Sequence, residues 1–175
     1  MENNIWVGGI EGDLAVISPN NKIETYPIQQ VKYIYETSSG NILITGRYGV
    51  YKINPLTKEF KLIEALKPDE NAFAFSTINS VYETKNGNLI LATNGEGVVF
   101  YNSKNQNIKK LTINSGMPSD IIQGIIPFSD SNIWASTTKG LANIIITEKD
   151  TIINIFDKQD GLSTTEFNYG SYRKL

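Results

Sequence analysis

Along nearly the whole chain, hydrophobic residues alternate with polar residues or form short runs, and turn residues separate the runs. In the stretch NGNLILATNGEG, residues 86–97, an Asn-Gly pair precedes an apolar run and a glycine-rich turn follows it. Asn-Gly is the strongest short-range signal for a β-hairpin, because both turn positions need a positive φ that these residues accept. The pattern therefore predicts a strand over residues 88–93.

Similar units recur along the chain. The asparagines that open the equivalent strands are 37, 47 and 44 residues apart, at Asn4, Asn41, Asn88 and Asn132. This spacing fits about four short strands per unit, as in a propeller blade. Helix-pair repeats have similar lengths, but these segments are rich in Ile, Val, Tyr and Thr, and no long stripe at helical spacing occurs. We therefore expect an all-β fold, a β-propeller fragment of about four antiparallel four-stranded blades.

The expected strands follow the same order in each unit. They cover residues 30–37, 41–46, 49–54 and 59–63, then 77–84, 88–93, 97–101 and 107–113, then 120–128, 132–137, 140–146 and 151–156. The first unit begins at its second strand, at Asn4, and a lone first strand over residues 166–173 brings the expected number to sixteen. We expect one partial propeller domain over residues 1–175, with units at about 1–29, 30–75, 76–119 and 120–165 and a spare strand at 166–175. Residues 64–74 should form a surface loop.

The composition excludes several classes of function. The chain has no cysteine and no histidine, which removes disulfides, thiolate chemistry, Ser-His-Asp hydrolysis and His-based zinc sites. The formal charge of −2 gives no long-range attraction to nucleic acid or to an anionic membrane. No apolar run approaches the ~20 residues of a membrane helix, and no signal peptide, P-loop, calcium loop or dinucleotide motif occurs. We expect a soluble segment with no metal, no cofactor, no nucleic-acid partner and no direct membrane contact, whose export signal lies outside this sequence.

Three features resemble one known family. At residues 88–98 and 132–141, a strand opens with Asn and is followed by a glycine and then a hydrophobic residue. The turn SGMPSD links two units at residues 115–120, and DGLSTTEFNYG occupies residues 160–170. These features resemble the periplasmic propeller repeats of two-component regulators, the sensor parts of Bacteroidetes hybrid histidine kinases. The family's propellers usually have about seven blades, so this chain would be a fragment.

The resemblance implies a non-catalytic function. The segment would belong to the periplasmic sensor of an inner-membrane hybrid two-component system, where it receives a glycan fragment and transmits the signal to a kinase elsewhere in the protein. One alternative is a protein-interaction scaffold like the WD-repeat propellers, although the Trp-Asp dipeptide does not occur here. Another is a propeller lyase or hydrolase, but such enzymes usually rely on His, a metal or clustered carboxylates.

Candidate binding residues lie in the turns between second and third strands and at the starts of first strands. These places are expected to share one face around the central channel, where propeller ligands gather. The candidates for ligand binding are Arg47, Tyr48, Asn79, Asn94, Glu96, Asp120, Gln123, Lys139 and Asn168. An Arg beside a Tyr can hold a carboxylate or sulfate while the ring stacks on a sugar, and the polar side chains offer hydrogen bonds to an oligosaccharide. Alternatively, the charged residues are solvated turn residues and the Asn and Asp residues cap backbone groups.

Four other residues are assigned structural roles. Trp6 and Trp134 occupy mid-strand positions and should pack in the core. Glu36 and Glu83 end first strands and are expected on the surface at hairpin ends rather than as a catalytic pair.

The irregular ends of the chain suggest association. Propellers share one blade between the two ends of the chain, which removes exposed sheet edges. Because the first unit lacks a first strand and a spare one follows the last unit, we expect a homodimer, in which exchange of the last strands would give eight blades from two chains. An open half-ring whose end blades pack on neighbouring copies is the alternative.

Overall fold

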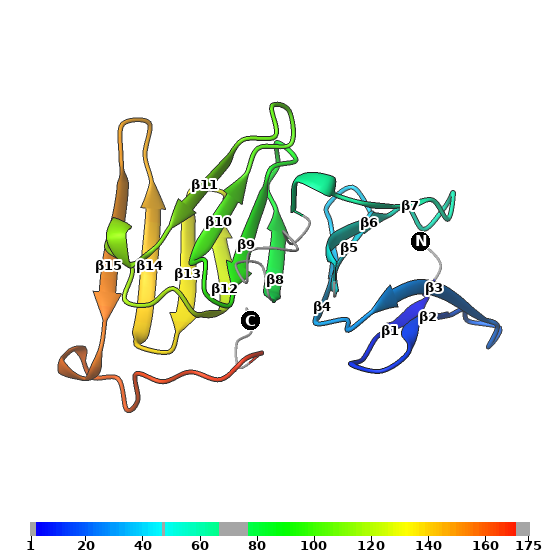
Figure 1. The fold of residues 1–175 in the computed structure, drawn as a ribbon, viewed down its shortest axis with the longest axis horizontal. Helices are drawn as coiled ribbons and strands as arrows, with labels where there is room; N and C mark the ends of the chain where they lie inside the picture. Colours follow the sequence, from blue (N-terminus) through cyan, green and yellow to red (C-terminus); the bar gives the residue numbers. More distant parts are fainter. Residues whose placement is uncertain (1–2, 47, 67–76, 171–175) are drawn as a thin grey trace.

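The structure is a computed structural model that describes residues 3–46, 48–66 and 77–170 (Figure 1). These residues contain fifteen β-strands and three one-turn 3-10 helices, and no α-helix is found among them. The strands form four antiparallel sheets, in which neighbours in space are also neighbours in sequence. The prediction of an all-β fold with four antiparallel units is therefore confirmed. We name the sheets blades 1 to 4 in chain order.

Blade 1 has three strands and each of the other blades has four. Blade 1 consists of β1 (Ile5–Val7), β2 (Asp13–Ile17) and β3 (Ile23–Gln29), and blade 2 of β4 (Tyr33–Glu36), β5 (Ile42–Gly46), β6 (Gly49–Ile53) and β7 (Phe60–Leu62). Blade 3 consists of β8 (Ile78–Glu83), β9 (Leu89–Thr93), β10 (Val98–Tyr101) and β11 (Ile108–Leu111), and blade 4 of β12 (Ile122–Ser129), β13 (Asn132–Thr137), β14 (Gly140–Ile146) and β15 (Thr151–Phe156). The strands β13, β14 and β15 have the predicted bounds.

Local turn chemistry explains why each unit folds as a meander. In blade 3, Gly87 has a φ of 78° and the Thr84 N–H donates to the Asn88 carbonyl across the turn at 2.9 Å. Blade 2 repeats this turn, with the Thr37 N–H donating to the Asn41 carbonyl at 2.8 Å. Glycine accepts the positive φ without a steric cost, so each turn fixes the register of its two strands.

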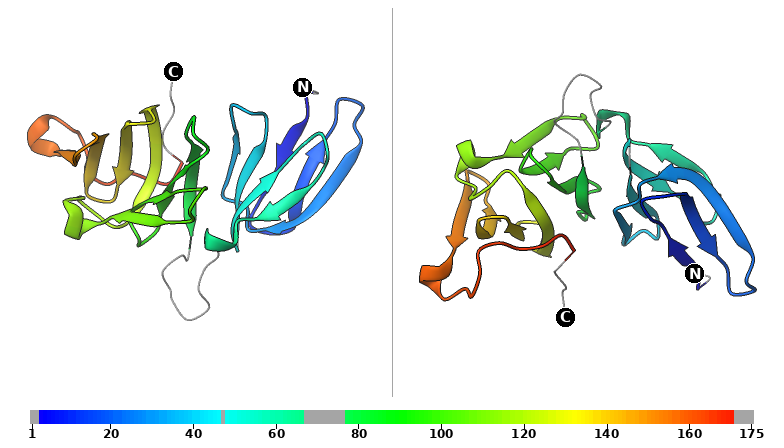
Figure 2. Two further views of the ribbon diagram at one scale, coloured as in Figure 1. Left: turned by 90° about the horizontal axis from the view of Figure 1, so that it is seen from above. Right: turned by 60° about the horizontal axis from the view of Figure 1, so that its bottom comes forward.

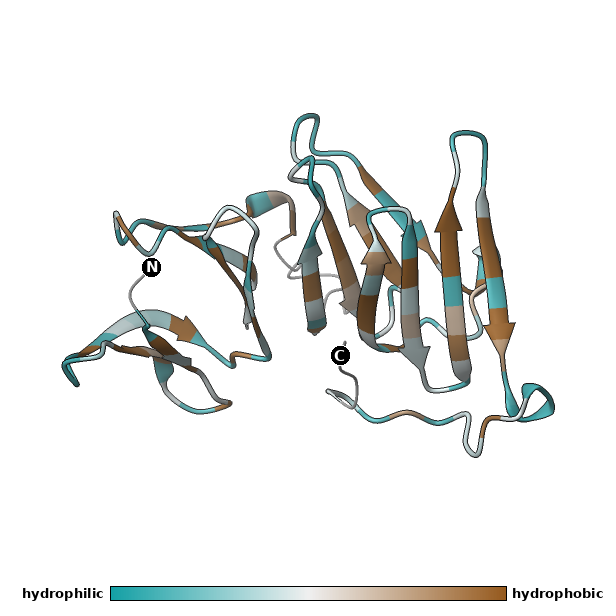
Figure 3. Cartoon of the chain, turned by 180° about the vertical axis from the view of Figure 1, so that it is seen from behind, coloured by the Kyte–Doolittle hydropathy of each residue, from teal (hydrophilic) through white to brown (hydrophobic). Residues whose placement is uncertain are grey.

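The core lies between the blades rather than within one sheet. Three buried clusters fill the spaces between blades 1 and 2, blades 2 and 3, and blades 3 and 4. Figure 3 shows the hydrophobic residues concentrated along the strands, while the turns are mostly hydrophilic. The four blades follow one another along an arc (Figure 2). Each blade therefore depends on its neighbours to bury its two faces, as in other repeat folds.

Both tryptophans are partly buried. Trp6 packs against the cluster between blades 1 and 2, and its ring stacks on Tyr26 with centroids 6.0 Å apart. The Trp134 ring lies 5.2 Å from that of Phe156 on the other face of blade 4. The expected packing role is thus observed, although neither ring is fully enclosed.

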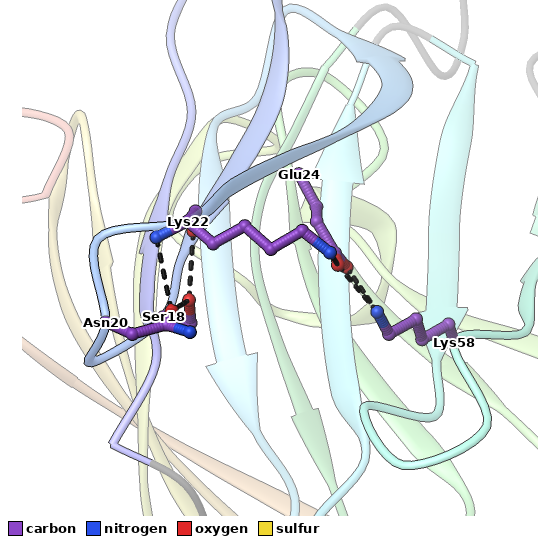
Figure 4. A network of polar contacts seen from close by, with 5 residues as sticks. All are labelled: Ser18, Asn20, Lys22, Glu24 and Lys58. Carbon is purple, nitrogen blue, oxygen red and sulfur yellow. Dashed lines mark hydrogen bonds and ion pairs between the residues drawn. The ribbon is translucent and has the colours of Figure 1, made fainter.

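Ion pairs join neighbouring blades near their surface. Glu24 of β3 binds Lys22 at 3.1 Å and Lys58 of the β6–β7 turn at 2.6 Å (Figure 4). Lys58, and then Lys22, hold the pKa of Glu24 below its usual value. Glu83 pairs with Lys52 of blade 2 at 2.9 Å, and its side chain is 8% exposed. The expectation that Glu83 is a surface residue was wrong, because Lys52 of the preceding blade covers it.

Several predicted features fall wholly or partly outside the described residues. These are Arg47, residues 67–74 of the predicted loop and residues 171–173 of the predicted last strand. The start of the loop, Glu64–Leu66, forms a 3-10 turn in which Leu66 is buried. Residues 166–170 contain no strand, so that part of the last prediction was wrong.

The segment after blade 4 runs back along the concave side of the arc (Figure 2). The Tyr169 hydroxyl donates a hydrogen bond to the Lys32 carbonyl, and the Lys32 ammonium lies 5.6 Å from the centroid of the Tyr169 ring. This segment therefore contacts the start of blade 2 within the same chain. Strand exchange between two copies stays a prediction.

Candidate functional site

The turns between second and third strands lie at the same end of the blades as the starts of the first strands. This follows from the meander, because the direction of the chain reverses at each turn. We call this end the hairpin face. It carries the β1–β2 turn, the β5–β6 turn, the β9–β10 turn and the β13–β14 turn. Except for Asn168, which lies in the segment after blade 4, the sequence-predicted candidates that the structure describes belong to these turns or to the first-strand starts beside them.

At the junction of blades 3 and 4, the structure brings Asn94, Glu96 and Asp120 together. The N–H groups of Gly95 and Gly97 both donate to the Asp120 carbonyl, at 3.0 and 2.9 Å. Asn94 forms an isolated β-bridge with the residue that follows Asp120. The β9–β10 turn is thus hydrogen-bonded to the linker that enters blade 4.

Two of these side chains have structural partners. The Asp120 carboxylate accepts a hydrogen bond from the Ile113 N–H at 2.8 Å and so holds the linker between blades. Glu96 forms an ion pair with Lys110 of β11. Exposed ion pairs contribute little stability, typically about 0–1 kcal/mol, so Glu96 can exchange this partner for a ligand at small cost.

The glycines of this turn are explained by geometry. Gly97 has a φ of 72°, and a Cβ there would lie 2.0 Å from the Leu111 carbonyl oxygen. Gly140 of blade 4 has a φ of 116°, and a Cβ there would lie 2.6 Å from the Phe156 carbonyl oxygen. Only glycine fits at these positions, and no ligand is needed to account for them.

Lys139 and Asn168 lie at the blade 4 end of the hairpin face. Both residues are exposed. The segment that carries Asn168 is attached to the β13–β14 turn, since the Gly140 N–H donates to the Thr165 carbonyl at 2.6 Å and the Phe167 N–H donates to the Thr137 carbonyl at 3.2 Å. The two side chains therefore belong to one local surface.

Asn79 and Gln123 occupy equivalent bulges in the first strands β8 and β12. Asn79 is 6% exposed, and its Nδ2 donates to the Ile122 carbonyl at 2.8 Å, which connects the two strands. Gln123 is partly exposed, and its side chain has no hydrogen-bond partner within the described part of the chain. Asn79 therefore joins the blades, whereas the Gln123 amide is available to a ligand.

Tyr48 lies in the β5–β6 turn and is 48% exposed. Its neighbour Arg47 is outside the described residues, so the predicted pair cannot be placed. Sequence reasoning missed Tyr169, which is 41% exposed on the same face and contacts Lys32. Burial, and to a lesser extent Tyr33, raises the pKa of Tyr169. Only its place in the motif DGLSTTEFNYG distinguished this tyrosine in the sequence.

The hairpin face offers an aromatic ring, amides and an ammonium group, which suit hydrogen bonding and stacking. Among the described residues, no group of three or more acidic side chains is placed to hold a metal ion. No helix in the described ranges is long and apolar enough to cross a membrane.

Short antiparallel meanders that follow an arc and share cores with their neighbours define the blades of a β-propeller. Similar structures support this class. The chain superimposes on the extracellular domain assigned to the hybrid two component system BT4673 from B. thetaiotaomicron with a TM-score of 0.69, at 15% identity, covering 95% of this chain and 23% of that one. The extracellular domain assigned to the hybrid two component system BT3049 from B. thetaiotaomicron gives a TM-score of 0.54 at 19% identity, covering 93% of this chain and 28% of that one.

An enzyme also has this fold. A catalytically inactive histidine-to-alanine variant of virginiamycin B lyase from Staphylococcus aureus gives a TM-score of 0.57 at 17% identity, covering 91% of this chain and 60% of that one. No protein family matches the sequence, and no curated protein matches it either. These likenesses confirm, at the level of the fold, the resemblance to the propeller sensor domains of two-component regulators. The chain spans less than a third of the two sensor chains.

Proposed function

We propose that this chain is a ligand-receiving segment of an extracytoplasmic sensor in a hybrid two-component system, located in the periplasm as part of an inner-membrane protein. The observation that carries the proposal is the fold of this chain. The superposition on the extracellular domain of one such system covers 95% of this chain. The chain supplies binding groups and no reaction.

The proposed ligand is a glycan fragment that binds at the hairpin face. Tyr48 presents an exposed ring for stacking on a sugar, and Gln123 and Lys139 present an amide and an ammonium group for its hydroxyl or acidic substituents. Asn94, Glu96 and Asn168 complete the polar surface. Asn79 and Asp120 act on this surface indirectly, because they hold first strands and linkers in place.

A thermal-shift screen tests the proposal. The chain is heated with each member of an oligosaccharide panel, and each mixture is then examined by mass spectrometry. A higher Tm with an intact oligosaccharide supports the proposal. Cleavage or other covalent turnover would contradict a non-catalytic role, and an unchanged Tm across the panel would count against glycan binding by this chain.

Variants locate the site once an oligosaccharide binds. We expect Tyr48→Ala to weaken binding by more than about 1 kcal/mol, roughly fivefold, while folding stays intact. Lys139→Ala should also weaken binding. The matched control is Lys104→Ala, since Lys104 is an exposed lysine in the β10–β11 turn at the opposite end of blade 3. Equal affinity of the Tyr48 variant and the parent, or an equal loss in the Lys104 variant, would contradict this placement.

A lyase is the rival function, because virginiamycin B lyase has the same fold. The structure of that lyase was solved as an inactive histidine-to-alanine variant, and this chain contains no histidine. Any lyase activity here would therefore need another general base. The mass spectra of the thermal-shift screen detect such an activity directly.

A further inference from the structure

An open cavity of about 570 Å³ lies between blades 3 and 4. The β8–β9 and β10–β11 turns contribute to its lining, so it is at the end of the blades opposite the hairpin face. Ile90 and Phe100 of blade 3 and Ile146 of blade 4 line it with apolar side chains, and Asp130 of the β12–β13 turn adds a carboxylate. Apolar cavities of about this size with a few polar groups are typical of ligand sites.

The register of the strands identifies the equivalent positions at the junction between blades 2 and 3. In each blade, one row of paired residues crosses the four strands and faces the next blade. The rows consist of Tyr35, Leu43, Lys52 and Lys61 in blade 2 and of Tyr82, Ile90, Phe100 and Lys109 in blade 3. Phe100 therefore occupies in blade 3 the position that Lys52 occupies in blade 2.

At the junction between blades 2 and 3, the chain itself supplies a cation. The Lys52 Nζ lies 2.9 Å from the Glu83 Oε1, and the Glu83 side chain is only 8% exposed. Burial, followed by Glu83, raises the pKa of Tyr35, as expected for a ring close to this carboxylate. An ammonium group, a carboxylate and a tyrosine ring thus meet at this junction.

At the junction between blades 3 and 4, the tyrosine and the carboxylate are present without the ammonium group. Asp130 accepts a hydrogen bond from the Tyr82 hydroxyl at 2.7 Å and another from the Lys85 backbone N–H at 2.9 Å. Both donors are neutral, and Asp130 forms no ion pair within the described part of the chain. Each carboxylate oxygen can accept a further hydrogen bond. A negative charge therefore borders the cavity without a cation beside it.

Lys109 lines the same cavity but is held at its outer edge. Its Nζ donates a hydrogen bond to the Thr151 Oγ1 of blade 4 at 3.1 Å. Three strand spacings of about 4.8 Å separate it from Tyr82 along the row, or about 14 Å between the backbones. Lys61 holds the same position in blade 2, where Lys52 forms its ion pair nonetheless. A lysine at this edge is thus compatible with a second cation.

We propose that the cavity between blades 3 and 4 binds a primary alkylammonium group, which takes the place that Lys52 has at the preceding junction. The ammonium donates charge-assisted hydrogen bonds to the Asp130 carboxylate, and the Phe100 ring attracts its positive charge. The alkyl chain covers the apolar side chains of Ile90 and Ile146. A free alkylamine and the side chain of a lysine share this chemistry. The inference concerns a separate site and does not depend on the proposed glycan ligand.

An NMR titration of the chain with n-pentylamine at constant ionic strength tests the proposal. At pH 7 this amine is protonated, as a lysine side chain is. The backbone amide of Lys85 is the reporter, because its N–H donates to Asp130. We expect a saturable shift of this signal and of the Phe100 amide at millimolar amine. The uncharged n-pentanol should bind at least about tenfold more weakly, since it forms no charge-assisted hydrogen bond.

Variants test the two groups that are assigned to the ammonium. Asp130→Asn should weaken pentylamine binding at least about tenfold. Phe100→Lys keeps the carboxylate but supplies an internal ammonium, so it should abolish binding. The matched control is Glu148→Gln, which removes an exposed carboxylate from the β14–β15 turn and should leave the affinity unchanged. No saturable shift, equal binding of pentanol, or equal affinity of the Asp130 variant and the parent would overturn the proposal.

The preceding junction provides an internal check. Lys52→Ala removes the native ammonium there, so pentylamine should then also shift the Glu83 amide in that variant. An unchanged Glu83 signal would contradict the equivalence on which the proposal rests. A comparison with Nα-acetyl-lysine amide identifies the source of the amine. Tighter binding of this derivative than of pentylamine supports a lysine side chain as the ligand, and tighter binding of pentylamine supports a free amine.

Discussion

Replacing Asn79 distinguishes a structural role of this residue from the ligand-binding role that its position in the sequence suggested. The side chain is 6% exposed, and its Nδ2 donates to the Ile122 carbonyl at 2.8 Å. Asn79→Ala leaves that carbonyl without this donor. A buried polar group that loses its partner costs about 1–3 kcal/mol. For a chain of this size, each kcal/mol lowers the Tm by about 2–4 °C, so we expect a decrease of roughly 2–12 °C.

The effect should depend on the donor rather than on the size of the side chain. Asn79→Asp keeps the size but places a carboxylate oxygen beside the Ile122 carbonyl, in a buried site where an unpaired charge is costly. We expect Asn79→Asp to be less stable than Asn79→Ala at pH 7. Burial raises the pKa of the new carboxyl, so the folded state binds more protons than the unfolded state. The difference in stability between Asn79→Asp and Asn79→Ala should therefore become smaller as the pH falls.

Urea denaturation of the three proteins at several pH values provides the measurement. The control is Asn168→Ala, because Asn168 is exposed and its replacement should change stability by no more than about 0.5 kcal/mol. The reasoning would be refuted if Asn79→Ala were as stable as the control, or if the aspartate variant were the more stable of the two at pH 7.

Three further predictions concern stability. Thr45→Val should raise the Tm, because the buried Thr45 Oγ1 has no hydrogen-bond partner among the described residues and an unsatisfied hydroxyl costs about 1–3 kcal/mol; a lower Tm by calorimetry would contradict this. Gly97→Ala should lower the free energy of unfolding, measured by urea denaturation, by more than about 2 kcal/mol, since its Cβ would lie 2.0 Å from the Leu111 oxygen at a positive φ. Gly95→Ala should lower it by less, because Gly95 has a positive φ but no atom within 4 Å of the added Cβ. A larger loss for Gly95→Ala than for Gly97→Ala would contradict this explanation. Burial raises the pKa of Tyr82, so the unfolded state loses this proton first and stability should fall as the pH rises above about 10. In Tyr82→Phe, the free energy of unfolding should fall less steeply with pH in this range. The same pH dependence in the variant and the parent would contradict the prediction.

The sequence by itself determined the strands and their pairing within each blade. The turn over residues 84–88 closes through Gly87, which has a positive φ whereas Asn86 does not, and a short turn leaves antiparallel pairing as the available arrangement. For this reason the predicted bounds of β13, β14 and β15 agree with the structure. The location of the candidate turns at one end of the blades also follows from the meander, without knowledge of the packing.

Only the tertiary structure decided which of those residues are buried. Glu83 was expected on the surface, yet Lys52 of the preceding blade covers it. Asn79 was a candidate either for ligand binding or for capping a backbone group, and the structure shows that it bonds to the Ile122 carbonyl of the next blade. Each partner is more than thirty residues away in the sequence, at a place set by how the blades pack. A strand also needs a partner edge: residues 166–170 carry a strand-like sequence but contact Lys32 through Tyr169 and form no strand. Turn geometry is encoded locally, whereas burial and the pairing of an isolated strand depend on distant segments.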